Sequence, residues 1–169
     1  MTAAPDTVPD ASTARATRRR WPSGVGVLTT RDGVGYRGAT VTAFAFVSVD
    51  PPLVLACLDR TGRMADLVPG VGAFAVSVLD RSHEVLADRF AGRGPLVDAD
   101  FGGAPYRLSA AGNPLLHGAL AWVDSVVHAI HDGGDHVIVV GRVVESGVGA
   151  DSDDPLLFYE GRYRRIEGE

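Results

Sequence analysis

Short runs of apolar and β-branched residues, each ended by turn residues, follow one another along most of the chain. Residues 25–30 form such a run, which a turn at 31–33 ends. Residues 38–49 form a second extended region, and the sequence Asp50-Pro51-Pro52 ends it because proline cannot donate to a sheet ladder. This pattern predicts strands over both regions. By the same criteria, further strands are predicted over 53–58, 74–79, 115–127, 136–146 and 155–158.

Helical patterns are fewer. Residues 64–68, directly before a Pro-Gly pair, predict a short helix. Residues 82–90 predict a second one, because Val85, Leu86 and Phe90 share a face, and Ser82 is its expected N-cap. Residues 92–113 are rich in Gly, Pro and Asp and predict a long irregular excursion.

Many short strands with only one or two helices predict a mainly β domain, a β-barrel or sandwich with a few short helices. A doubly wound parallel sheet would need a helix after almost every strand, and the pattern lacks these helices. The glycines at 24 and 26 are not followed by a third glycine at 29, and no helix begins there. We therefore exclude a Rossmann dinucleotide fingerprint.

Length and composition fit one globular domain. The chain has 169 residues, of which 46% are hydrophobic and 22% charged. Residues 1–17 have no apolar period and predict a flexible N-terminal tail, with the folded domain over 18–169. The lone cysteine, Cys57, excludes an internal disulfide, and its apolar neighbours favour a buried structural thiol.

The charge pattern bears on partners and location. A net charge of −5 gives no electrostatic reason to expect nucleic acid. No apolar run approaches the roughly 20 residues that span a bilayer, so we expect no membrane contact. Arginines at 15 and 18–20 lead straight into Trp21-Pro22, which is unlike a secretory signal. We expect a cytoplasmic protein.

Hydroxyl residues recur in the second extended region. Thr40, Thr42 and Ser48 fall at even spacing, so on one continuous strand they would project to the same side. Hydroxyls and free main-chain N–H groups suit the polar edge of a heteroaromatic ring such as an isoalloxazine. A solvent-facing strand with threonine present for its β-propensity explains the same pattern.

A polar turn over 59–63 follows the predicted strand 53–58. Main-chain N–H groups there, with Thr61 and Arg63 beside them, form a candidate phosphate cradle, and Arg89 is a candidate second charge for the same anion. A polar turn with a solvated arginine, and an arginine that compensates a helix dipole, are the alternatives.

Two histidines and two aspartates lie within residues 131–136. The flexible glycines at 133 and 134 suit a rigid metal site badly, so we expect no metal here. A tight turn that presents Asp135 and His136 at the head of the next strand explains the motif better, because such a histidine can bind substrate or carry a proton. An exposed turn histidine without a role stays an alternative.

Together these segments resemble the short-chain flavin reductase family, whose members supply reduced flavin to two-component monooxygenases. The resemblance runs from about Pro22 to Tyr163 and rests on the order and spacing of its parts. These parts are PSGVGVLTT, GATVTAFAFVSVDPPLVLACLDRTGR, GAFAVSVLDRSHEVLADRFAG, GNPLLHGALAWVDSVV, HDGGDHVIVVGRV and PLLFYEGRY. The resemblance implies a split β-barrel of the FMN-binding type, a homodimer, and a flavin site near the subunit interface.

The resemblance also implies roles for single residues. His136 would lie near the nicotinamide and the flavin, and we expect its neighbour Asp135 to fix the imidazole. The nicotinamide would contact His136, Phe158, Tyr159, Glu160 and Gly161. The flavin would contact Thr40, Val41, Thr42, Ala43, Ser48, Val49, Cys57, Leu58, Asp59, Thr61, Arg63, Arg89 and Phe90.

The chain departs from the family pattern at several of these positions. Ala43 stands where many relatives carry serine, which removes one hydrogen bond to the ring. Arg63 and Met64 replace smaller hydroxyl residues, which changes the expected anion contacts. Ser125 stands where a cysteine is frequent.

The expected function is that of a flavin reductase that transfers a hydride from NADH or NADPH to FMN or FAD. Its partners would be free flavin, pyridine nucleotide and a separate flavin-dependent monooxygenase. A non-enzymatic flavin carrier or sensor is one alternative. A split-barrel oxidase of the pyridoxine-phosphate type is another, although no basic cluster for a second phosphate lies near His136 in the sequence.

Overall fold

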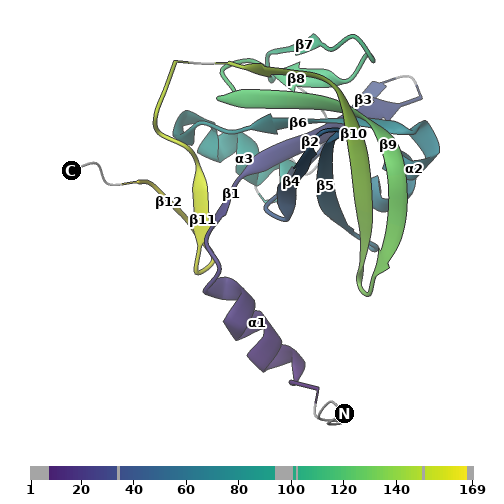
Figure 1. The fold of residues 1–169 in the computed structure, drawn as a ribbon. Helices are drawn as coiled ribbons and strands as arrows, with labels where there is room; N and C mark the ends of the chain where they lie inside the picture. Colours follow the sequence, from purple (N-terminus) through teal and green to yellow (C-terminus); the bar gives the residue numbers. More distant parts are fainter. Residues whose placement is uncertain (1–7, 34, 94–100, 102, 150, 167–169) are drawn as a thin grey trace.

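The computed structural model describes residues 8–33, 35–93, 101, 103–149 and 151–166. Within these ranges the chain is mainly β, with a few short helices (Figure 1). This confirms the predicted fold class. None of the helices in the described ranges is long and apolar enough to cross a membrane.

One antiparallel sheet of seven strands forms the body of the molecule, in the order β3-β2-β6-β9-β10-β5-β4. Its two edge strands, β3 and β4, are consecutive in the chain, and residues 42–43 connect them. The sheet therefore curls on itself into a split barrel, and a hydrogen bond of 2.9 Å from Cys57 N to Ala43 O holds the connection to β5. The strands are β2 (Gly26–Asp32), β3 (Gly35–Val41), β4 (Phe44–Val49), β5 (Pro52–Asp59), β6 (Ala73–Val78), β9 (Ala121–Gly133) and β10 (His136–Val148).

Smaller elements surround the barrel. A three-stranded sheet combines β1 (Ser23–Gly24), β11 (Leu157–Tyr159) and β12 (Arg162–Arg164), and a hairpin combines β7 (Tyr106–Leu108) and β8 (Pro114–Leu116). The helices are α1 (Ala11–Arg19), α2 (Met64–Val71) and α3 (Glu84–Phe90), with a 3-10 turn, η1 (Arg81–His83), before α3. Helix α1 projects away from the barrel beside β11 and β12 (Figure 1), and none of its residues is buried.

Two apolar clusters form the core. Leu28 belongs to the first, which also contains Phe74 and Val139. Its neighbour Val27 belongs to the second, which contains Phe90. Successive side chains of a strand point to opposite faces, so β2 separates the two clusters and contributes to both. Burial of this apolar surface is the main favourable contribution to folding.

Several predicted elements differ from those observed. The predicted helix 64–68 continues to Val71 with Pro69 inside it, and residues 106–108 of the predicted irregular excursion form β7. The extended region 38–49 is two strands, because the chain bends at 42–43. The predicted helix 82–90 begins as η1, and its N-cap is Asp80, whose carboxylate accepts a hydrogen bond from Ser82 N at 2.8 Å. The predicted strand 115–127 is divided between β8 and β9.

The predicted N-terminal tail also differs from the structure, which has helix α1 where we expected irregular chain. Asp10 is its N-cap and accepts hydrogen bonds from Ser12 N and Thr13 N. Residues 1–7, and residues 94–100 and 102 of the predicted irregular excursion, lie outside the described residues. The flexibility of the tail stays a prediction.

Candidate active site

A cavity of about 660 Å³ opens at one end of the barrel. The β3–β4 connection forms one wall and the β9–β10 hairpin lies on another side. The turn between β11 and β12, with the end of α1, closes the third side. The lining residues are Arg18, Arg19, Trp21, Ser23, Thr40, Val41, Thr42, Ala43, Phe44, Ala45, Leu55, Cys57, Asp59, Gly133, Asp135, His136, Ile138, Phe158, Tyr159, Glu160 and Gly161.

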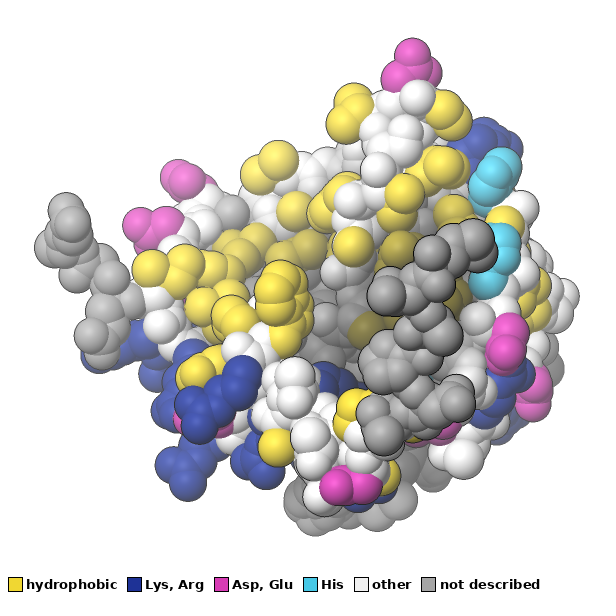
Figure 2. Space-filling model, turned by 60° about the horizontal axis from the view of Figure 1, so that its bottom comes forward, with side chains coloured by type: hydrophobic (Ala, Val, Ile, Leu, Met, Phe, Trp, Pro, Cys, Tyr) yellow, Lys and Arg dark blue, Asp and Glu magenta, His cyan; other side chains and the backbone are white. Residues whose placement is uncertain are grey.

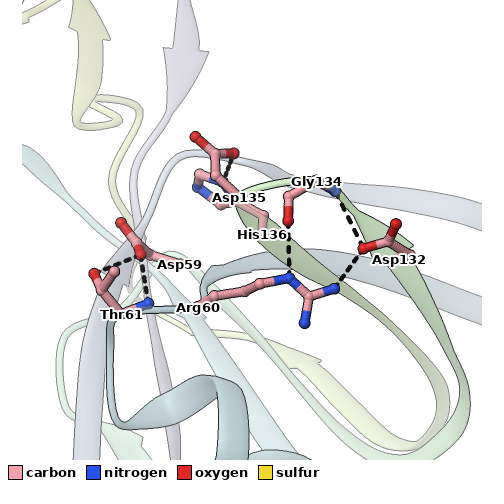
Figure 3. A network of polar contacts seen from close by, with 7 residues as sticks. All are labelled: Asp59, Arg60, Thr61, Asp132, Gly134, Asp135 and His136. Atoms are coloured by element: carbon pink, nitrogen blue, oxygen red, sulfur yellow. Dashed lines mark hydrogen bonds and ion pairs between the residues drawn. The ribbon is translucent and has the colours of Figure 1, made fainter.

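His136 and Asp135 lie at the tip of the β9–β10 hairpin. His136 Nδ1 and Asp135 Oδ1 are 2.6 Å apart, and the histidine side chain is 27% exposed against 93% for Asp135 (Figure 3). Gly134 has φ +75°, a conformation that suits glycine and allows the tight turn. The predicted turn that presents both residues at the head of a strand is confirmed as geometry.

Arg60 holds this hairpin in place, a role that the sequence reasoning missed. Its Nε donates to Gly134 O at 2.8 Å, its backbone N donates to Asp135 O at 3.0 Å, and its guanidinium also pairs with Asp132 (Figure 3). The hydrogen bond from Arg60 is the main cause that lowers the pKa of the Asp132 carboxyl below its ordinary value. The end of β5 is therefore tied to the turn that carries His136.

Of the predicted phosphate cradle over 59–63, only Asp59 lines the cavity. Its Oδ1 accepts hydrogen bonds from Thr61 N and Thr61 Oγ1 at 2.8 and 2.7 Å, which lower the pKa of Asp59. Arg63 forms an ion pair with Asp32, with Nη2 and Oδ2 2.9 Å apart. Neither Thr61 nor Arg63 is among the lining residues.

The expected row of three hydroxyls on one strand does not form. Thr40 lies one residue before the end of β3, and its hydroxyl donates to Ala87 O in α3 at 2.6 Å. Thr42 lies in the bend between β3 and β4. Ser48 lies beyond a register shift in β4 and does not line the cavity. The reason is the bend, which ends the period-two alternation that the prediction assumed.

Other predicted flavin contacts lie elsewhere in the fold. Leu58 and Phe90 are each 4% exposed and belong to the two core clusters. Val49, in contrast, is 93% exposed on edge strand β4. Arg89 lies on α3, outside the cavity lining. The binding roles assigned to these residues and to the lining residues stay predictions.

The predicted nicotinamide segment, 158–161, lies wholly on the cavity wall. Glu160 and Gly161 are the central residues of the β11–β12 turn and have φ of 53° and 79°, as a type I′ turn requires. Arg19 supports this turn, because its Nη2 donates to Glu160 O at 2.9 Å and its own carbonyl accepts from Glu160 N at 3.1 Å. Sequence reasoning missed Arg18 and Arg19, which it treated as evidence about targeting alone.

The cavity combines apolar and polar walls. Leu55, Ile138 and Trp21 offer apolar surface, whereas the 40–45 segment offers backbone groups and hydroxyls. Burial raises the pKa of the Cys57 thiol, so this cysteine is mainly the uncharged thiol at neutral pH. In the described part of the chain no group of three or more His, Cys, Asp or Glu residues could hold a metal ion. The arrangement suits a flat organic ring system bound beside an ionisable histidine.

Comparison with known proteins gives a consistent picture. The family model described as "Flavin reductase like domain" matches residues 18–167. The chain is 37% identical over 161 residues to the reductase subunit HsaB of a flavin-dependent monooxygenase from Mycobacterium tuberculosis, covering 95% of this chain and 84% of that protein. It is 38% identical over 151 residues to a flavin reductase from Pseudomonas putida, covering 88% and 86%.

Solved structures agree. The NADH:FAD oxidoreductase SgcE6 of Streptomyces globisporus matches with a TM-score of 0.86 and 33% identity, over 99% of this chain and 100% of that one. BorF, the flavin reductase component of a bacterial two-component tryptophan halogenase, matches with a TM-score of 0.85 and 30% identity, over 95% and 100%. The expected resemblance is confirmed.

Proposed function

The chain belongs to the flavin reductase like domain family, and we propose that its cavity is where a hydride passes from NADH or NADPH to FMN or FAD. The enzyme is an NAD(P)H:flavin oxidoreductase that supplies reduced flavin to a partner monooxygenase. The observation that carries the proposal is the cavity itself. It brings together the 40–43 segment, His136 and the 158–161 turn, which are far apart in the sequence.

The lining residues fit the two ring systems. A volume of about 660 Å³ falls in the usual range for ligand sites, and hydride transfer needs the two rings stacked in one water-poor space. The 40–45 segment, which includes the bend at 42–43, would hold the polar edge of the isoalloxazine with main-chain groups and the Thr42 hydroxyl. The 158–161 turn would hold the nicotinamide against it. When bound, the two rings supply the hydride donor and the hydride acceptor.

His136 is the residue that can hold or move a proton beside these rings. Its Nδ1 lies 2.6 Å from the Asp135 carboxylate, so Nδ1 carries the proton and Nε2 is the ring nitrogen left to meet a ligand. Asp135 fixes the ring orientation, and Arg60 positions the hairpin that carries both. Leu55 and Ile138 reduce the access of water to the same space.

Association of two copies through strand β4 is part of the proposal. Phe46, Val47 and Val49 are 67%, 51% and 93% exposed on this edge strand. Large apolar side chains gathered on an edge strand are typical of a protein–protein interface. A homodimer would cover them and would bring the interface close to the cavity wall formed by Phe44 and Ala45.

Anaerobic mixing of the purified protein with each nucleotide and each flavin tests the function. We expect loss of the nicotinamide absorbance of NADH or NADPH together with bleaching of FMN or FAD, at a rate that depends on enzyme concentration. Flavin binding without oxidation of either nucleotide would instead identify a carrier or sensor. Oxidation of a pyridoxine-type phosphate with oxygen, in place of nucleotide oxidation, would identify the related oxidase.

A further inference from the structure

Arginines concentrate beside the cavity in two segments that are distant in the sequence. Arg15, 18, 19 and 20 lie in or directly after α1, and Arg162, 164 and 165 lie in or directly after β12. The two segments, residues 11–23 and 157–166, contain one acidic residue, Glu160, although the whole chain carries a net charge of −5. Figure 2 shows arginine side chains gathered at the lower left of the face, beside a band of apolar side chains.

These segments enclose a second hollow, which we call the basic groove. Its volume is about 670 Å³, and it lies between α1 and β12. The residues that line it are Ser12, Arg15, Ala16, Arg19, Arg20, Glu160, Arg162 and Arg164. Arg19 and Glu160 also line the cavity, so the basic groove and the cavity adjoin at the β11–β12 turn.

The positive charge in the groove is only partly compensated. Arg20 pairs with the Glu160 carboxylate, with Nη1 and Oε1 2.9 Å apart, and Arg19 donates to Glu160 O. Within the described ranges, no ion pair occupies the side chains of Arg15, Arg162 or Arg164. A helix C-terminus favours one or two cations, but Arg162 and Arg164 belong to a strand. The helix dipole therefore does not account for the cluster.

We propose that the basic groove binds the adenylate half of a dinucleotide, through its phosphate, while the redox ring of the same molecule occupies the cavity. Guanidinium groups bind phosphate oxygens through paired hydrogen bonds, and a pyrophosphate brings two negative charges. The groove begins where the nicotinamide segment ends, so one extended molecule can occupy both spaces. This inference rests on the proposed function and names the part of the substrate that the cavity does not hold.

NADH, NADPH and FAD all carry an adenylate half joined through a pyrophosphate. Substrates that lack this half show which of these dinucleotides occupies the groove. Reduced nicotinamide mononucleotide retains the nicotinamide and one phosphate, and FMN retains the isoalloxazine and one phosphate. The test variant is Arg162→Gln/Arg164→Gln. The matched control is Arg31→Gln/Arg142→Gln, which changes the same charge at exposed positions outside both hollows. Circular dichroism and thermal midpoints verify folding of both proteins.

We expect the test variant to raise the KM for NADH roughly tenfold with FMN as acceptor, and to leave the KM for reduced nicotinamide mononucleotide unchanged. If FAD is the occupant, the Kd for FAD rises instead, and that for FMN does not. The control variant should match the wild type in every arm. Either pattern supports the groove as an adenylate site and identifies its dinucleotide.

Two outcomes would overturn the inference. If KM for NADH and NADPH and Kd for FAD are unchanged in the test variant, the groove holds no adenylate. The proposed function would still stand in that case, because flavin reduction by the wild type tests it separately. Equal losses for NADH and its mononucleotide would show an effect on the cavity rather than on the groove. Calorimetric titration with ADP-ribose, which lacks a redox ring, measures binding to the groove without any turnover. The inference can therefore be tested even if the protein shows no reductase activity. Weaker binding to the test variant supports the inference, and equal binding contradicts it.

Discussion

Phe90 contributes to the structure through its ring packing in the second apolar cluster. Its ring is 4% exposed, lies 5.2 Å from the Phe101 ring centroid, and approaches Gly38 so closely that a Cβ there would lie 2.6 Å from Phe90 Cε1. The missing side chain at position 38 therefore makes room for this ring. The structure thus gives Phe90 a role in the core of the protein.

We predict that Phe90→Ala lowers the free energy of unfolding by about 3–5 kcal/mol, because it leaves a cavity in a packed cluster. Urea denaturation followed by circular dichroism measures this change. Val85→Ala, on the same helix but 78% exposed, is the control and should change little. A stable Phe90→Ala protein with weakened flavin binding would instead place this ring in the binding site.

Single residues also show the limits of sequence reasoning. Alternation identifies a buried strand, but it does not say which buried residues border a cavity, so Leu58 and Cys57 looked equivalent. The structure buries Leu58 in the barrel and places Cys57 on the cavity wall. The function of Arg60 depends on contacts with residues 132–135, more than 70 positions away, and no local pattern reports such contacts.

At the level of elements, the Asp80 carboxylate holds the start of η1 through hydrogen bonds to both of its oxygens. Oδ1 accepts from Ser82 N, and Oδ2 accepts from the Ser152 hydroxyl at 2.5 Å. The hydrogen bond from Ser152, followed by those from Ser82, lowers the pKa of Asp80 from 3.8 to about 2. Asp80 thereby ties the start of the α3 region to the segment that leads into β11.

This depressed pKa predicts how stability depends on pH. The carboxylate contributes its full stabilisation above pH 3.8, its unfolded value, and loses that stabilisation as the pH falls toward about 2. We expect Asp80→Asn to lower stability at pH 6 by about 1 kcal/mol, because the amide still caps η1 but replaces hydrogen bonds to a charged group by neutral ones. The substitution should also reduce the loss of stability between pH 4 and pH 2, because the titrating carboxyl is gone. Urea midpoints over this range measure both effects. An acid limb identical to that of the wild type would contradict the assignment, and Asp153→Asn is the control.

Strands with a strong apolar or β-branched pattern could be predicted from the sequence, but the bends that divide one strand from the next could not. The strands at 25–30, 53–58 and 74–79 were confirmed within a few residues, because apolar alternation and β-branched residues mark them. The bend at 42–43 carries no glycine or proline, so it looked like continuous strand. Helix α1 buries no residue, and without an apolar face it gave no helical signal.

At the scale of the molecule, the exposed β4 edge predicts self-association. We expect the wild type to sediment as a dimer at micromolar concentration, because solvent exposure of Phe46, Val47 and Val49 is unfavourable. Val49→Arg places a charge in the proposed interface and should shift the protein toward monomer. Sedimentation velocity measures both states, with Val148→Arg, 89% exposed on β10, as the control. A monomeric wild type would contradict this prediction.

The convergence of distant segments was predictable only through the family resemblance. Composition and periodicity indicated a β-rich domain, and spacing alone did not place residues 40–43, 135–136 and 158–161 together. The structure brings them to one cavity because β3 and β11 end there and β10 begins there. The cation-rich wall formed by α1 was not anticipated, since its contact with the β11–β12 turn is a long-range one.

The measurement that tests the central claim most directly is the anaerobic single-turnover rate constant for flavin reduction by NADH, in wild type and in His136→Ala. His136 lines the cavity at the start of β10, outside the two apolar clusters, so its loss should leave the fold intact. We predict a rate constant lower by roughly tenfold or more, because the ionisable group beside the rings is removed. His128→Ala, at an exposed position of β9 outside the cavity, should match the wild type. An unchanged rate constant in His136→Ala would contradict the account.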